Sequence, residues 1–207
     1  MAAADDSQTP FQNIPWAAAL LANDDLIWRI PGSRFIKQDR EDSLFAEVFK
    51  THRTLNNVIC VYPKPKPGET KPRDVAMLAT IGNGLNGHSN IMHGGIVAAL
   101  LDEAMGMLQN VMIEYEATSS LTPGKSGDEV SMGQAGAFTA ELTIKYLKPV
   151  QTPGSCKVTA HFTKIEGRKQ WIHAEIRQWN GKGDGEGVVC ATADALFIGP
   201  KKAAAKL

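Results

Sequence analysis

The sequence predicts an α+β fold in which one long helix packs against an antiparallel sheet. One observation is a stretch of good helix formers from His93 to about Ile113 with almost no polar face, which is typical of a buried helix. Another is the run of strand patterns joined by short turns that follows Phe138. Two shorter strand candidates precede the helix. Together they indicate a helix that covers one face of an antiparallel sheet.

Length and composition are those of one sizeable domain, or one domain with an extension. The 207 residues are 43% hydrophobic and 21% charged, as in ordinary folded proteins. Lys+Arg and Asp+Glu balance at 22 each, which argues against a nucleic-acid or anionic-membrane partner. No apolar signal segment is seen, and no run approaches a membrane span. We therefore expect a soluble, intracellular protein with no membrane partner.

The N-terminal region, residues 1–56, is predicted to be a helical extension that is partly disordered. Residues 1–14 are polar and acidic and look disordered. A short helix is predicted over residues 15–22, where a proline occupies the first turn. A second helix is predicted from about residue 39 to residue 50, because apolar side chains recur on one helical face. These side chains are Leu44, Phe45, Val48 and Phe49.

The main domain is predicted over residues 57–200. Residues 57–62 and 74–81 are β-like, and the glycine- and asparagine-rich sequence GNGLNGHSN follows the second strand. After the helix, residues 115–136 form a long connection that is either a mobile lid or an insertion. The sequence FTAELTIKYLKPV then alternates as a strand does, and three more strand patterns follow it, two of them flanking a turn at residues 166–168.

Three cysteines, Cys60, Cys156 and Cys190, are widely spaced and form no CxxC pair. Each lies in an apolar or alternating run. We therefore expect them to be small buried residues and not metal ligands or nucleophiles.

A glycine pair, Gly94-Gly95, lies where the loop turns into the long helix, with Ser89 or Asn90 as candidate N-caps. The pair can serve close packing, by letting the start of the helix approach the sheet. Alternatively, free N–H groups at a helix N-terminus can stabilise an anion or a developing oxyanion. The glycines by themselves leave both interpretations open.

Two adjacent acids, Asp102 and Glu103, are the only charged residues between His93 and Glu114. Neighbouring residues differ by about 100° around a helix, so the two carboxylates cannot share one environment. A carboxylate in an apolar cleft has a raised pKa and suits general-base or nucleophilic work. The alternative is that both acids pair with lysine or arginine across an interface. We expect Asp102 to be the acid that faces the cleft.

The sequence HGGIVAALLDEAMG resembles the helix signature of the hotdog-fold acyl-CoA thioesterases, which include phenylacetate-pathway and thioesterase-superfamily-member enzymes. In that signature an acidic residue, here Asp102, stands eight positions after the first glycine. The sequence FTAELTIKYLKPV resembles the family's next strand, with Thr139 at the position of a Ser or Thr that assists the attacking water. The resemblance covers roughly residues 74–198. It implies a hotdog fold, a long central helix wrapped by a curved antiparallel sheet.

The resemblance implies hydrolysis of an acyl thioester carried by CoA or by an acyl-carrier protein, a reaction of lipid metabolism. The backbone N–H of Gly94, assisted by that of Gly95, would polarise the thioester carbonyl. Asp102 would activate water as a general base or attack directly, and Thr139 would orient the water or the carboxylate. No metal or prosthetic group is implied, and CoA enters only as part of the substrate.

The spacing of Gly94 and Asp102 predicts a site shared between two chains. Eight residues of helix span about 12 Å at about 1.5 Å per residue, yet a water-activating acid must lie within one water of the carbonyl. One helix therefore cannot supply both groups to one substrate, whereas two antiparallel helices across a two-fold axis can. The family builds its sites in this way. We expect an obligate homodimer or a homotetramer made of two dimers.

Other residues around the helix are candidates for substrate contact. The family often has an asparagine six positions before the histidine of the signature, where this chain has Gly87. Asn86 and Asn90 flank that position, and either could contact the substrate. His93 is expected to cap or shape the loop beside the site. Glu103 is expected to face away from the catalytic acid, as a supporting or interface group.

Two other functions are compatible with the resemblance. One is a non-catalytic module that binds acyl-CoA or an acyl-carrier protein, and the other is a hotdog hydratase or dehydratase. The presence of both Asp102 and Thr139 favours the hydrolase over the binding module. The Asp and His pair of the hydratase subgroup is not found.

The chain ends in Ala205-Lys206-Leu207, a one-step variant of the Ser-Lys-Leu peroxisomal address. The alternative is an Ala/Lys-rich solvated tail, residues 201–207. We therefore expect a location in the peroxisomal matrix, reached through the import receptor, or in the cytosol.

Overall fold

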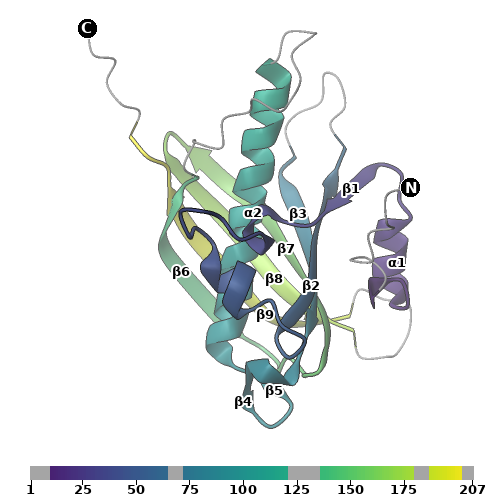
Figure 1. Ribbon diagram of the computed structural model, residues 1–207. Coiled ribbons are helices and arrows are strands. Elements are labelled where there is room, and N and C mark those ends of the chain that lie inside the picture. The colour runs from purple at the N-terminus through teal and green to yellow at the C-terminus, as the bar shows by residue number, and fades with distance from the viewer. Residues whose placement is uncertain (1–9, 65–71, 121–135, 180–186, 202–207) are drawn as a thin grey trace, which may run out of the picture.

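In the computed structural model, the described residues 10–64, 72–120, 136–179 and 187–201 form a seven-stranded antiparallel sheet and one long helix (Figure 1). The helices are α1 (Pro15–Leu21) and α2 (Gly94–Ser120). The strands of the sheet are β1 (Leu26–Arg29), β2 (Leu55–Pro63), β3 (Asp74–Ile81), β6 (Phe138–Tyr146), β7 (Gly154–Glu166), β8 (Lys169–Gln178) and β9 (Val188–Ile198). Shorter elements are the helical turns η2 (Gly32–Arg34), η3 (Leu44–Val48) and η4 (Asn83–Leu85) and the small hairpin of β4 (Asn86–His88) and β5 (Ile91–Met92).

The strand order is β1-β2-β3-β7-β8-β9-β6, with antiparallel neighbours throughout. The predicted strands on both sides of the long helix are confirmed, and the turn between β7 and β8 uses Gly167 at a φ of 58°. Strand β1 was not predicted. Its four residues, LIWR, are too few to show an alternation, and they form a strand because they pair with β2.

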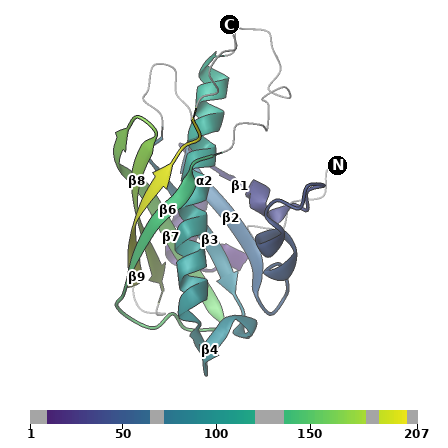
Figure 2. The same ribbon diagram turned by 90° about the vertical axis from the view of Figure 1, so that its left-hand side faces the viewer.

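The two faces of the sheet are covered by different helices. Met77 of β3 belongs to the main core, which includes the inner residues of α2. Its neighbour Leu78 points the other way and packs with Trp16 and Ala17 of α1, because side chains alternate along a strand. Figures 1 and 2 show the sheet curving around α2, with α1 on its outer side. This is the helix-in-sheet arrangement of the hotdog fold, as expected.

Helix α2 is hydrophobic enough to resemble a membrane-spanning helix. Residues Gly94–Tyr115 have the length and composition of a membrane-crossing helix, with a mean hydropathy of 1.4, so the prediction that no run approaches a membrane span is wrong. In the structure, 50% of that stretch is buried inside the fold. Leu100, Leu101 and Leu108 are fully buried in the main core. The apolar composition is thus that of a core helix.

The helix predicted over residues 39–50 is reduced to the single turn η3, Leu44–Val48. Arg40 and Asp42 have φ values of 65° and 61°, a left-handed conformation that a right-handed helix cannot pass through. The four apolar residues also divide between two environments. Phe45 and Phe49 pack against the core, whereas Leu44 and Val48 remain 48% and 59% exposed.

Several predictions fall outside the described residues. They concern residues 1–9, most of the connection at residues 115–136, and Ala205-Lys206-Leu207. Of that connection, the described part shows α2 continuing to Ser120. For residues 10–14 the predicted disorder is wrong, because Phe11 is fully buried against α1 and the sheet. The predicted division into an extension, a main domain and a tail stays a prediction.

Candidate functional site

The start of α2 is capped by its own histidine. The Nδ1 atom of His93 accepts a hydrogen bond from the backbone N–H of Gly95 at 3.0 Å, the contact that a helix N-cap makes. The prediction of Ser89 or Asn90 as N-cap is wrong, because both lie in the turn between β4 and β5. The expectation that His93 caps the loop is confirmed.

The cap leaves Gly94 as the residue with a free N–H at the helix start. Within the described residues, no hydrogen bond is formed by the Gly94 N–H, whereas that of Gly95 is occupied by His93. The hydroxyl of Tyr146, at the end of β6, donates to the Gly94 carbonyl at 2.9 Å. The start of α2 is thus tied to the sheet with one donor left over for an anion or oxyanion. The sequence did not single out Tyr146.

The loop before α2 is exposed but closely packed at its predicted contact residues. A Cβ on Gly87 would lie 2.9 Å from the Cα of His93, so the backbone leaves no space for a side chain at this position. The Asn86 side chain forms a hydrogen bond with the Thr152 hydroxyl, and the Asn90 carbonyl accepts from the Thr152 N–H at 3.0 Å. Both asparagines therefore hold the loop to the chain between β6 and β7.

The structure brings Asp102 and Thr139 together. The Thr139 hydroxyl donates to Oδ1 of Asp102 at 2.8 Å. Asp102 lies on α2, and Thr139, 37 positions later in the chain, is the second residue of β6. Asp102 is half-buried and Thr139 is exposed. This pair is a carboxylate held in one orientation by a neutral donor, at a place that solvent and a ligand can reach.

The two adjacent acids of α2 are both half-buried but face different environments, and burial penalises the charge of Glu103. Its Oε1 accepts a hydrogen bond from the Ser33 hydroxyl, a residue 70 positions earlier. The sequence did not indicate that burial would act on the Glu103 carboxyl. The reason is that an N-terminal segment, invisible to local sequence patterns, covers the Glu103 side of the helix.

Burial raises the pKa of the Glu103 carboxyl to about 7. The hydrogen bond from Ser33 opposes this rise. The carboxylates of Asp42 and Asp102 add to it, and the Arg34 guanidinium opposes it more weakly. The acid whose pKa burial raises is thus the one that faces the N-terminal segment.

That segment, residues 33–49, is called the strap below. Figures 1 and 2 show it crossing α2 on the side away from the sheet. Arg34 is only 2% exposed and anchors the strap: its guanidinium donates to the Phe45 carbonyl at 2.6 Å and also to the Leu55 carbonyl. Burial lowers the Arg34 pKa. A buried arginine bound to carbonyls is a structural clasp, and no signal in the sequence distinguished it from a surface arginine.

Strand β6 forms one edge of the sheet, where it pairs with β9 alone among the described strands. Most of its residues are exposed. Phe138 and Tyr146 are 66% and 57% exposed, and Leu147, just after the strand, is 56% exposed. The exposed apolar side chains thus lie at the two ends of β6, and its unpaired backbone edge could pair with another strand.

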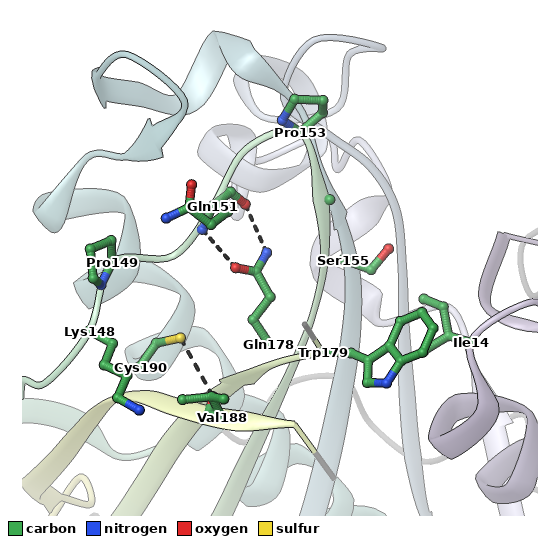
Figure 3. Close-up of a pocket in the computed structure, with 11 residues that line it drawn as sticks. Ile14, Lys148, Pro149, Gln151, Pro153, Ser155, Gln178, Trp179, Val188 and Cys190 are labelled. Atoms are coloured by element: carbon green, nitrogen blue, oxygen red, sulfur yellow. Dashed lines mark hydrogen bonds between the residues drawn. The ribbon is translucent and has the colours of Figure 1, made fainter. Parts of the chain in front are cut away.

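A cavity of about 480 Å³ lies elsewhere, at the end of the sheet where β6 ends and β9 begins. Figure 3 shows its polar centre: the Gln178 side chain accepts from the Gln151 N–H at 2.7 Å and donates to the Gln151 carbonyl at 2.8 Å. These groups satisfy one another. None of the predicted site residues lines this cavity, and Thr139 lies at the opposite end of β6.

The cysteines are buried, as predicted. Cys60, Cys156 and Cys190 are free thiols that are 1%, 0% and 3% exposed. Burial raises the pKa of Cys60 and of Cys156 to about 12, so both are neutral packing residues at physiological pH. Within the described residues, no group of three or more His, Cys, Asp or Glu side chains could hold a metal ion.

Comparison with known proteins identifies the central part of the chain. A family model described as the thioesterase superfamily matches residues 89–183. The chain is 32% identical over 120 residues to an uncharacterised protein of Schizosaccharomyces pombe, covering 57% of this chain and 55% of that protein. It therefore spans little more than half the length of this relative.

Two further matches are more distant. The chain is 25% identical over 154 residues to verlamelin biosynthesis protein B of a Lecanicillium species, covering 67% of each. Among solved structures, the PaaI protein of Escherichia coli, from the phenylacetic acid degradation operon, is 15% identical with a TM-score of 0.45. That match covers 61% of this chain and 72% of the bacterial one.

Proposed function

We propose that the chain hydrolyses an acyl thioester of CoA or of an acyl-carrier protein, a proposal supported by the match of residues 89–183 to the thioesterase superfamily. The observation that carries the proposal is the hydrogen bond between Asp102 and Thr139. It joins an acid on the central helix to a hydroxyl on the neighbouring strand, at an accessible place on an otherwise apolar helix.

In the proposed reaction, Asp102 accepts a proton from a water molecule as that water attacks the carbonyl carbon of the thioester. Thr139 donates to one carboxylate oxygen, which leaves the other free to face the water. The resulting tetrahedral intermediate collapses by breaking the C–S bond. The thiol leaves with the proton that Asp102 took up, and the acyl group leaves as the free acid. No cofactor takes part in these steps.

The oxyanion of that intermediate needs a donor that Asp102's own helix start cannot supply. The N–H of Gly94 is the donor left free at the helix start, yet it lies about 12 Å along the helix from Asp102 at about 1.5 Å per residue. We therefore assign the oxyanion to the Gly94 N–H of a second chain. Each site of the homodimer would then combine one chain's acid with the other chain's helix start.

The open edge of β6 supports this assembly. Two copies of an edge strand can pair antiparallel about a two-fold axis, which makes the interface self-complementary. Such pairing would bring the exposed apolar side chains of β6 out of water. It would also place the second copy beside Thr139 and the face of α2 that carries Asp102. Two such dimers could associate further.

The proposal is tested by the release of free thiol from a panel of acyl-CoA and acyl-carrier thioesters that differ in chain length and aromaticity. Turnover of at least one member at enzymatic rates is expected. Tight binding of acyl-CoA without turnover would replace the hydrolase by a binding module. Hydration of an unsaturated acyl-CoA, with no thiol released, would replace it by a hydratase.

A further inference from the structure

One turn of α2 is held from two sides by hydroxyl groups. Asp102 receives its hydrogen bond from Thr139 of β6, and Glu103 receives its own from Ser33 of the strap. Because the two acids point about 100° apart around the helix, β6 and the strap flank a single strip of the helix surface. Figures 1 and 2 agree with this placement, with β6 and the strap on different sides of α2.

The strip between these flanks is only partly covered in a single chain. Between Gly95 and Gly106, the residues within about 40° of Asp102 around the helix are small: Gly95, Ala98 and Gly106. Beyond Gly106, the larger Gln109 and Ile113 continue the same face. Gly95 is exposed, and Ala98 and Gly106 are half-buried. A Cβ on Gly106 would meet no atom within 4 Å. The strip therefore leaves room for the backbone of another element to approach the proposed catalytic acid.

The strap is firmly seated beside this strip. Besides the anchors of Ser33 and Arg34, the Lys50 ammonium donates to the Arg34 carbonyl at 2.7 Å. The rings of Phe45 and Phe49 stack edge to face at 5.6 Å and pack against the main core. A segment with this many hydrogen bonds and core contacts is a fixed part of the fold.

The strap nevertheless presents apolar side chains to solvent. Ile36 is 74% exposed, and Phe35, Leu44 and Val48 are 52%, 48% and 59% exposed. The guanidinium bonds of Arg34 to Phe45 and Leu55 hold Phe35 close to η3, so these side chains belong to one region. Large apolar side chains gathered on a fixed surface are typical of a protein interface.

We propose that the outward side of the strap (Phe35, Ile36, Leu44 and Val48) is part of the seat for a second copy of this chain. This inference rests on the shared site of the proposed function. A second copy whose Gly94 approaches Asp102 must lie on the strip between β6 and the strap. It would pair with β6 on one side, and on the other it would cover the apolar side chains of the strap.

The strap would then be a recognition element that this chain adds to the family module. It lies wholly outside residues 89–183, the part that matches the superfamily. Glu103 acts as a positioning residue in this arrangement. It holds the strap, through Ser33, against the same helical turn that carries Asp102.

The main test compares aspartate substitutions at exposed apolar positions by sedimentation equilibrium of the full chain. Ile36→Asp and Leu44→Asp should each weaken dimerisation at least about tenfold, because a charge would be buried in the interface. Ile165→Asp is the matched control. Ile165 is 47% exposed near the tip of the β7–β8 hairpin, away from the strap, and its substitution should leave the dimer unchanged. Dimerisation of the two strap variants equal to that of the control would overturn the proposal.

A second comparison tests the anchor. Ser33→Ala removes the hydrogen bond to Glu103, whereas Ser43→Ala removes only a local one, from the Ser43 hydroxyl to the Arg40 carbonyl at 2.8 Å. Ser33→Ala should speed amide hydrogen exchange in residues 33–49 and weaken the dimer severalfold, and Ser43→Ala should do neither. Faster exchange with an unchanged dimer would mean that the strap is not part of the seat.

These outcomes are separable from the fate of the proposed function. A dimer that Ile36→Asp weakens but that hydrolyses no thioester would retain the seat and reject the hydrolase. A dimer that resists Ile36→Asp and still hydrolyses thioesters would do the reverse. A wild-type chain that stays monomeric at high concentration would overturn both the seat and the shared site.

Discussion

The hydroxyl of Thr139 lies 2.8 Å from Oδ1 of Asp102 and donates a hydrogen bond to it. The bond fixes the carboxylate of the central helix against the edge strand β6, where a second chain can reach it. It is the contact around which the proposed hydrolysis is built. The first two predictions test it from each side.

Asp102→Asn should abolish thioester hydrolysis and leave the fold intact. The amide retains the size of the carboxylate but cannot accept a proton from water, and the loss of a general base costs about 10²–10⁴-fold in rate. The measurement is kcat for thiol release, with circular dichroism as the check on folding. Asp24→Asn, an exposed aspartate after α1, is the control. Turnover of Asp102→Asn at the wild-type rate would remove this residue from the mechanism.

Thr139→Ala should lower kcat by about 10–100-fold with little change in KM. A hydrogen bond to a charged group contributes about 1.5–3 kcal/mol, and its loss would free the carboxylate to rotate. Thr139→Ser keeps the hydroxyl and should retain most of the activity. Thr143→Ala, on the exposed part of the same strand, should have no effect. If Thr139→Ser were as inactive as Thr139→Ala, the hydroxyl would not be the group that matters.

Glu103→Gln should flatten the pH dependence of stability. Burial raises the Glu103 pKa from its ordinary 4.5 to about 7 in the folded chain, so its contribution to stability is fully present below pH 4.5 and is lost as the pH rises through 7. The loss is at most about 3 kcal/mol. Urea unfolding of wild type and variant between pH 4.5 and 8 measures it. Glu47→Gln, at an exposed position, is the control, and its stability should depend on pH as that of the wild type does. Parallel stability curves for the wild type and Glu103→Gln would contradict the prediction.

Gly87→Ala should destabilise the fold by about 1–3 kcal/mol, the cost of overpacking. Its Cβ would lie 2.9 Å from the Cα of His93, so the cap of α2 and the neighbouring Gly94 would have to move. Thermal unfolding measures the loss, and kcat should fall with it. Gly32→Ala is the control, because a Cβ there meets nothing within 4 Å. Equal melting temperatures for the two variants would show that the loop yields at no cost.

Much of the fold follows from local pattern. The alternation of the C-terminal strands and the apolar composition of the helix after His93 predicted their elements to within a few residues. Those features recur every second residue in a strand and on every side of a buried helix, so a short window reveals them. Local patterns did not predict the strand Leu26–Arg29, and they wrongly predicted a full helix over residues 39–50. There, pairing with β2 and two left-handed residues decide the conformation.

The candidate site divides in the same way. The resemblance of two sequence motifs to those of the hotdog thioesterases predicted that Asp102 and Thr139 act together, and the structure joins them by a hydrogen bond. The sequence did not show that burial acts on Glu103, or that the buried Arg34 binds two backbone carbonyls. Burial depends on what covers a side chain in the folded molecule. Glu103 is covered by a segment 70 residues earlier in the chain, beyond the reach of any local pattern.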